Sequence, residues 1–154
     1  MAQKEHIDWH TYVAFTTGLI AVLAAIASFQ ASGFSSQMLE EKNNAILLQS
    51  KANKEWNHYL AADITNHILK TFANNQEQMT FQNKALDLEN QVIETTSKSN
   101  TYFKKNSSLS TAGTFFEIAI ALSSMSILVK RKSFWIFSFL LAGIGIYFLR
   151  VGFL

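Results

Sequence analysis

Apolar and polar positions are segregated along this chain into long blocks. Residues 9–39 contain no Asp, Glu, Lys or Arg, residues 106–129 contain only Glu117, and residues 133–154 contain only Arg150. The segment between them, residues 40–105, contains sixteen charged residues. This segregation excludes a compact soluble enzyme with one mixed core and indicates a small membrane protein with a polar middle.

The apolar blocks predict three transmembrane helices. A bilayer core about 30 Å thick requires about 20 helical residues, and the blocks are too long and too irregular in alternation for strands. We expect spans at 12–33, 108–129 and 133–154, separated by a tail (1–11), a polar middle (34–107) and a basic loop (130–132). The chain contains no proline, which permits long unbroken helices. The predicted fold class is an all-α membrane protein.

The first span has an alternative interpretation as a cleaved signal peptide. Ala25-Ile26-Ala27 resembles a cleavage site, which is typically small-x-small. The preceding residues include Glu5 and Asp8 as well as Lys4, so they do not form a basic leader. A retained span is therefore the preferred interpretation.

The loop between the second and third spans is entirely basic: Lys130, Arg131 and Lys132. The positive-inside rule predicts a cytoplasmic loop, which places the N-terminus in the cytoplasm and the middle segment outside it. Lys104, Lys105 and Arg150 lie at the opposite membrane face and favour the reverse orientation.

Small residues form a stripe on the first span. Ala14, Gly18, Ala21, Ala25, Ser28 and Ser32 follow one another at steps of 4, 3, 4, 3 and 4, so they share one helix face. Small residues let membrane helices approach closely. The stripe predicts a helix–helix interface, within one chain or between copies, although alanine is also common in membrane helices. Gly143 and Gly145 suggest a second close approach.

The two charges inside the spans, Glu117 and Arg150, leave three interpretations open. Arg150 can extend to the interface while Glu117 lies near the surface or is protonated. The two can form an ion pair that fixes the register of the last two spans. Alternatively, Glu117 is part of a proton or ion path.

The polar middle predicts a helical hairpin, a coiled-coil-like stalk with arms at about 35–73 and 78–106. Apolar residues recur at helical or heptad spacing, and the polar run 74–78 suggests a turn. The predicted packing residues are Trp56, Tyr59, Leu60, Ile64, Ile68 and Phe72 on one arm and Met79, Leu86 and Ile93 on the other. The arms can pair within one chain or between subunits.

Candidate chemistry is sparse. There are no cysteines, which excludes disulfides and thiolate metal sites. His6–His10 and Asp63–His67 each have i,i+4 spacing but no third ligand at a matching distance. No phosphate loop or hydrolase motif is present, and a net charge of +2 is too small to indicate nucleic-acid binding. We therefore expect no enzyme, metal or cofactor.

The chain resembles a known family. The residues that carry the resemblance are AVLAAIAS in the first span, then FFEIAIALSSMSILVKRKSFW and a final span ending GFL. Between them lie Ala52, Asn53, Trp56, Tyr59, Ala62 and Ile64, within KANKEWNHYLAADI. These features resemble the bacterial membrane proteins grouped under domain of unknown function 4337. The resemblance implies an N-terminal span, a helical middle and a C-terminal two-span hairpin, but no activity.

The sequence thus predicts a non-enzymatic structural or assembly protein of the bacterial inner membrane. Its expected partners are the lipid bilayer, further copies of itself and other membrane proteins. Two alternatives are a channel or transport component that uses Glu117, and an accessory subunit of a larger membrane complex.

Overall fold

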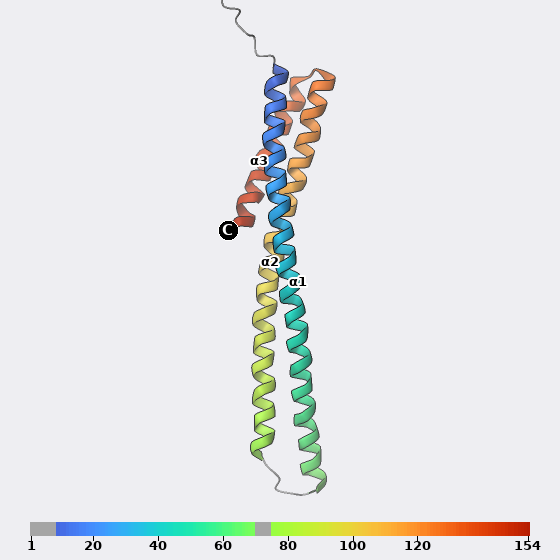
Figure 1. Ribbon diagram of the computed structural model, residues 1–154, viewed down its shortest axis with the longest axis vertical. Coiled ribbons are helices and arrows are strands. Elements are labelled where there is room, and N and C mark those ends of the chain that lie inside the picture. The colour runs from blue at the N-terminus through green and yellow to red at the C-terminus, as the bar shows by residue number, and fades with distance from the viewer. Residues whose placement is uncertain (1–8, 70–74) are drawn as a thin grey trace, which may run out of the picture. The chain divides into compact units, whose positions relative to one another are not determined.

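The computed structural model describes residues 9–69 and 75–154, and these residues form three α-helices and no strand (Figure 1). The helices are α1 (Trp9–Leu69), α2 (Asn75–Val129) and α3 (Lys132–Phe153). Continuous helices of 61 and 55 residues are possible because no proline interrupts them. The predicted all-α class is confirmed.

Each of the three helices is long and apolar enough to cross a membrane. The predicted spans 12–33 and 108–129 lie within α1 and α2, and the third coincides closely with α3. Both long helices continue without a break past residues 33 and 107, the predicted ends of the polar middle.

Four of the five residues in the predicted turn at 74–78 are helical in the structure. Asn75, Gln76, Glu77 and Gln78 already belong to α2, because asparagine and glutamine disfavour helix only weakly when no glycine or proline accompanies them. Asn74 and the predicted packing residue Phe72 lie outside the described residues, and the structure does not describe the side chain of Ile68.

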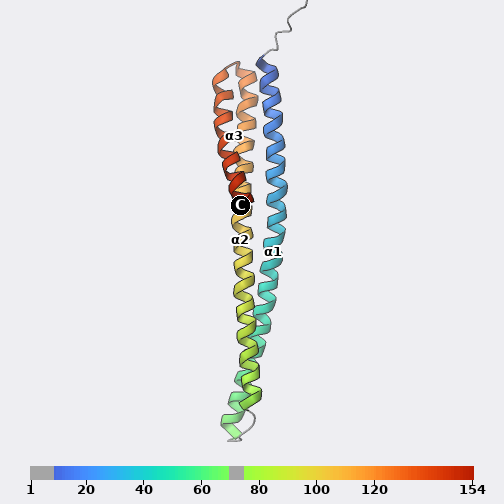
Figure 2. The ribbon, with the colours of Figure 1, turned by 90° about the vertical axis from the view of Figure 1, so that its left-hand side faces the viewer.

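The chain divides into two compact units. Unit 1 comprises Met1–Ser35 and Phe103–Leu154, and unit 2 comprises Ser36–Tyr102. Within unit 1, α3 lies beside the C-terminal part of α2, as the two views show (Figures 1 and 2).

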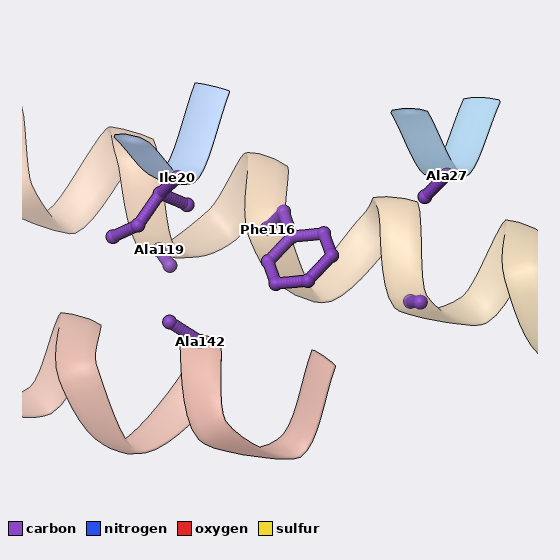
Figure 3. Packing of buried hydrophobic residues seen from close by; sticks show 6 residues of the cluster. Ile20, Ala27, Phe116, Ala119 and Ala142 are labelled. Carbon is purple, nitrogen blue, oxygen red and sulfur yellow. The ribbon is translucent and has the colours of Figure 1, made fainter. Parts of the chain in front are cut away.

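The interior of unit 1 is built from buried positions seven residues apart. These are Val13, Ile20 and Ala27 on α1, Leu109, Phe116 and Ser123 on α2, and Ser138, Gly145 and Gly152 on α3. A seven-residue repeat is typical of helices that pack at small crossing angles. Many of these side chains are small, and Figure 3 shows Ala119 and Ala142 facing each other beside the Phe116 ring. Small residues allow the close helix approach on which packing in lipid depends.

In unit 2, the segments of α1 and α2 run antiparallel along a seam of small residues. The buried residues are Ala45 and Ala52 on α1 and Ala85 and Ser99 on α2. The pairs that connect the helices are Met38–Ser99, Glu55–Lys84, Trp56–Glu89, His58–Phe81 and Asp63–Gln78. From the Met38–Ser99 pair to the Asp63–Gln78 pair, residue numbers on α2 fall overall as those on α1 rise, so the two segments are antiparallel.

Candidate functional site

Hydroxyl groups connect α1 to both other helices inside unit 1. The Thr17 and Ser123 hydroxyl oxygens lie 2.6 Å apart, and Thr17 donates to the Val13 carbonyl over 2.7 Å. Because a threonine hydroxyl carries one proton, Ser123 donates to Thr17. On the neighbouring residue, Trp135 Nε1 of α3 donates to Thr16 Oγ1 over 3.1 Å. Through these polar contacts, α1 is hydrogen-bonded to both α2 and α3.

Glycines bring α3 against α2. A Cβ atom at Gly145 would lie 2.7 Å from Phe116 Cε1, and one at Gly152 would lie 2.6 Å from Leu109 Cγ. Gly145 is therefore a point of close approach, as the sequence suggests. Gly143 is different, because a Cβ atom there would meet no other atom within 4 Å.

Gly143 instead lines an open groove between α1 and α3 in unit 1. The volume of this groove is about 370 Å³. The lining residues are Thr16, Leu19, Ile20, Leu23, Phe139, Ala142, Gly143 and Ile146. Thr16, the polar member, already accepts the Trp135 hydrogen bond, so the groove presents an apolar surface.

In unit 1, the small-residue stripe of α1 is not the surface through which α1 packs on α2 and α3. Ala14, Gly18, Ala21, Ala25, Ser28 and Ser32 are all exposed. Most of them directly follow residues that face the other helices: Ala14 follows Val13, Ala21 follows Ile20 and Ser28 follows Ala27. A step of one residue rotates a side chain by about 100° around a helix, so the stripe lies beside the surface through which α1 packs on the other helices.

A matching exposed line runs along α2. It contains Ser110, Thr114, Glu117, Ala121 and Ser124, again spaced 4, 3, 4 and 3 residues apart. On two antiparallel helices, the positions that follow the seam turn toward the same side of the pair. The Ser28 Oγ atom lies 3.6 Å from the Cβ position of Gly113, one turn before Glu117. The α1 stripe and the α2 line therefore form one face.

Glu117 and Arg150 are both exposed, and among the described residues neither forms an ion pair. The interpretation in which these two charges pair within the chain finds no contact in the structure. The interpretations as interface-seeking charges and as part of an ion path stay predictions.

The basic connector is compact. Lys130 has a left-handed backbone with φ of 55°, and Arg131 is the extended N-cap residue of α3. Lys132 is already helical, one residue earlier than the predicted third span. The Ser126 hydroxyl donates to the Arg131 carbonyl over 3.2 Å, which ties the turn to the end of α2.

In unit 2, two predicted packing residues lie at the seam between α1 and α2. Trp56 and Tyr59 are half-buried, and their rings meet edge to face with centroids 5.6 Å apart. Trp56 Nε1 also donates to Glu89 Oε1 on α2 over 2.7 Å. Next to this contact, Lys84 Nζ lies 2.8 Å from Glu55 Oε1, and this hydrogen bond lowers the Glu55 pKa below its ordinary value of 4.5.

The other predicted packing residues do not form the seam within the chain. Leu60, Ile64, Met79, Leu86 and Ile93 are 44–67% exposed. Each directly follows a seam residue, and the rotation of about 100° per residue carries it out of the contact. Their role in an interface between chains stays a prediction.

Four of these residues, all except Ile64, belong to a longer pattern with a seven-residue period. The seam positions repeat every seven residues, and so do the exposed positions that follow them. We call this set the outer stripe: Leu39, Ile46, Asn53 and Leu60 on α1, and Met79, Leu86, Ile93 and Asn100 on α2. The sequence signal is a second heptad series one residue out of phase with the alanine series Ala45, Ala52 and Ala85.

Metal-ligating groups do not gather in the described part of the chain. No group of three or more His, Asp or Glu side chains there could hold a metal ion. His6 lies outside the described residues, so the structure gives no distance between the His6 and His10 side chains. Asp63 accepts a hydrogen bond of 2.9 Å from Gln78.

No curated protein and no solved structure matches the chain. A family model described as Domain of unknown function (DUF4337) matches residues 9–79 and 70–154. Because these two matches together cover the three helices, the chain belongs to this family of unknown function.

Proposed function

We propose that this protein is a non-enzymatic membrane scaffold that assembles with copies of itself. The three apolar helical segments of unit 1 sit in the bilayer, and unit 2 extends from it as a paired-helix stalk. The outer stripe of unit 2 is the observation that carries this proposal.

The outer stripe has the character of a coiled-coil surface. Its members recur every seven residues, and its six apolar side chains are 44–67% exposed. A contiguous row of exposed large apolar side chains marks an interaction surface in a segment bathed by water. Heptad spacing suits packing against further helices, and both rows turn toward the same side of the helix pair.

Asn53 and Asn100 give the stripe a means of setting register. Each occupies one position in a row otherwise occupied by Leu, Ile or Met. A single asparagine among apolar heptad positions selects register and oligomeric state at some cost in stability. A second copy of unit 2 would offer the same pattern, so the occupant is a further copy of this chain.

The proposed placement follows the positive-inside rule. Lys130, Arg131 and Lys132 lie in the cytoplasm, and unit 2 lies on the opposite side of a bacterial inner membrane. The small-residue stripe of α1 supplies a second contact between copies within the bilayer.

Charge substitutions in the outer stripe test the proposal on the full chain in a mild detergent. Ile46→Glu combined with Ile93→Glu should lower the assembly mass measured by light scattering. Leu47→Glu is the matched control, since Leu47 is 55% exposed but lies outside the stripe. A monomeric unmodified protein, or an unchanged mass in the double variant, would contradict the proposal.

A second candidate function is an ion or proton path that uses Glu117. It is favoured by the exposed line of hydroxyl-bearing and small residues around Glu117 on α2, because intramembrane carboxylates are frequent in such paths. Ion flux in liposomes, abolished by Glu117→Gln, would support this function. A tight bilayer with the unmodified protein would exclude it.

A further inference from the structure

The groove between α1 and α3 is an apolar hollow on the outside of unit 1. Its volume of about 370 Å³ is within the range of small-molecule pockets, about 300–1,000 Å³. Gly143 contributes to the open space, since a Cβ atom there would meet no other atom within 4 Å. Because unit 1 is proposed to sit in the bilayer, lipids surround this groove, and its apolar lining suits a hydrocarbon chain.

One end of the groove lies toward the basic connector. Helices α1 and α3 begin at the same end of unit 1, as both views show (Figures 1 and 2). Trp135 in the first turn of α3 donates to Thr16 near the start of α1, which agrees with this direction. The groove residues of both helices therefore follow one another away from the connector.

Lys132 lies on the groove side of α3, between the groove and the connector. It precedes the groove residues Phe139 and Ile146 by 7 and 14 residues, about two and four helical turns. At 1.5 Å per residue, Lys132 is about 10 Å nearer the connector than Phe139. Lys132 is exposed, and it takes part in no ion pair with residues 9–69 or 75–154.

Tyr12 lies on the groove side of α1 at the same end. It precedes the groove residues Thr16 and Leu23 by 4 and 11 residues, about one and three helical turns. The hydrogen bond from Trp135 to Thr16 places Tyr12 level with the first turn of α3. Tyr12 is 53% exposed, and tyrosine is typical of the headgroup level of a membrane. A cation on α3 and a phenol on α1 thus flank one end of the groove.

The distances along α3 match the depth of one leaflet. A bilayer with its headgroups is about 40–45 Å thick, so a leaflet extends about 20 Å from its surface to the midplane. Ile146 lies 14 residues after Lys132, about 21 Å along the helix axis. With Lys132 at the level of the lipid phosphates, the groove covers the acyl-chain region of the same leaflet.

We propose that the groove holds one acyl chain of an anionic phospholipid whose phosphate is bound by Lys132 and Tyr12. An ammonium and a phenol both donate hydrogen bonds to phosphate oxygens. Lys130 and Arg131 are exposed beside Lys132 and add positive charge. Basic sites between transmembrane helices on the cytoplasmic side bind anionic headgroups, and the connector is proposed to lie on that side. This site requires the membrane placement proposed above, but it does not require assembly of copies.

Lipid competition on the purified full chain tests the headgroup part of the site. The chain in mild detergent is given equal amounts of anionic phosphatidylglycerol and zwitterionic phosphatidylcholine with the same acyl chains, and native mass spectrometry measures each retained lipid. The unmodified chain should retain one lipid per chain and prefer the anionic one. Lys132→Gln should lower this preference about fivefold, which corresponds to about 1 kcal/mol per basic residue beside anionic lipid. Lys132→Arg should keep the preference.

Arg150→Gln is the matched charge control. Arg150 lies four residues after Ile146 on the same side of α3, so it borders the other end of the groove. Its replacement also removes one positive charge but should leave the preference unchanged. Equal retention of the two lipids by the unmodified chain would overturn the site. A preference lost in Arg150→Gln but kept in Lys132→Gln would also overturn it.

Gly143→Leu tests the acyl-chain part of the site. The new side chain would occupy the open space of the groove, so the helices keep their packing while the acyl chain loses its place. Retention of both lipids should be lost. Gly33→Leu is the control, because a Cβ atom at Gly33 also meets no atom within 4 Å and Gly33 lies outside the groove. Undiminished retention in Gly143→Leu would contradict the site.

The assembly mass of the same variants, measured by light scattering, separates the lipid site from the proposed function. A second copy seated in the groove would make Gly143→Leu lower the mass and leave lipid retention intact, which would overturn the lipid site. If Ile46→Glu with Ile93→Glu dissociates the protein but no anionic lipid is preferred, the scaffold function stands and the lipid site is wrong. If the unmodified chain is a monomer that retains the anionic lipid, the lipid site stands and the proposed assembly is wrong.

Discussion

Substitution of Gly145 tests whether α3 packs on α2 as closely as the structure shows. The Cβ atom of Gly145→Ala would lie 2.7 Å from Cε1 and 2.9 Å from Cδ1 of Phe116. Carbon atoms in favourable contact are about 3.5–4.0 Å apart. The ring, or the whole of α3, would therefore have to move by about 1 Å.

The Phe116 ring has little room for such a movement. Phe116 is 0% exposed and shares its cluster with Ile20, Ala119 and Ala142. Inserting a methyl group into a well-packed interior costs about 1–3 kcal/mol. Gly145→Ala should lower the free energy of unfolding by this amount relative to a glycine-to-alanine change without a clash.

Gly143→Ala is that matched control. It lies on the same helix, carries the same change in helix propensity, and places its Cβ in open space. The difference between the two variants therefore isolates the contact with Phe116. Unfolding by sodium dodecyl sulfate in mixed micelles, followed by circular dichroism, gives both free energies.

Equal stability of Gly145→Ala and Gly143→Ala would refute the reasoning. A compensating change strengthens the test, since Phe116→Leu removes the ring that the new methyl group would strike. The combined variant should be less destabilised than the sum of the single changes, because residues in contact are not additive.

Two further predictions follow from polar contacts. The Thr17–Ser123 hydrogen bond should contribute about 0.6 kcal/mol, up to about 1.7 kcal/mol, in a double-mutant cycle of Thr17→Val and Ser123→Ala measured in the same micelles; an interaction energy of zero would contradict it. The Glu55 pKa is lowered chiefly by the hydrogen bond from Lys84, so its ionised form stabilises unit 2 at neutral pH and this contribution is lost as pH falls through the lowered pKa. Glu55→Gln should therefore lose less thermal stability than the unmodified chain between neutral pH and pH about 3, and an equal loss would show that the contact has no effect.

The helical content of the chain could be predicted from its sequence because it depends on features that extend over many consecutive residues. Charge-free blocks of about 20 residues and the absence of proline favour long membrane helices. The close approach at Gly145 was also visible, since a glycine inside an apolar helix suggests contact with another helix. The openness at Gly143 could not be assigned in the same way: glycines at positions i and i+2 face opposite sides of a helix, and the sequence alone does not say which of the two sides meets another helix.

The seam could not be located from the large apolar residues. Hydrophobic size favours Leu60, Ile64, Met79, Leu86 and Ile93 as the interior of unit 2, but the helices pack through Ala45, Ala52 and Ala85. Alanine helix faces permit a closer approach of the two backbones. The contacts that decide this register, such as Trp56 with Glu89, join residues far apart in the sequence.

In both units, exposed residues directly follow the residues at which the helices pack. The character of these exposed residues differs between the two units. In unit 1, the positions that follow the seam are mostly small or hydroxyl-bearing, and close packing of small faces is what associates helices in a bilayer. In unit 2, they are mostly Leu, Ile or Met, for which burial from water is the driving force. Each unit therefore presents, beside its own seam, a face suited to association in the environment proposed for it.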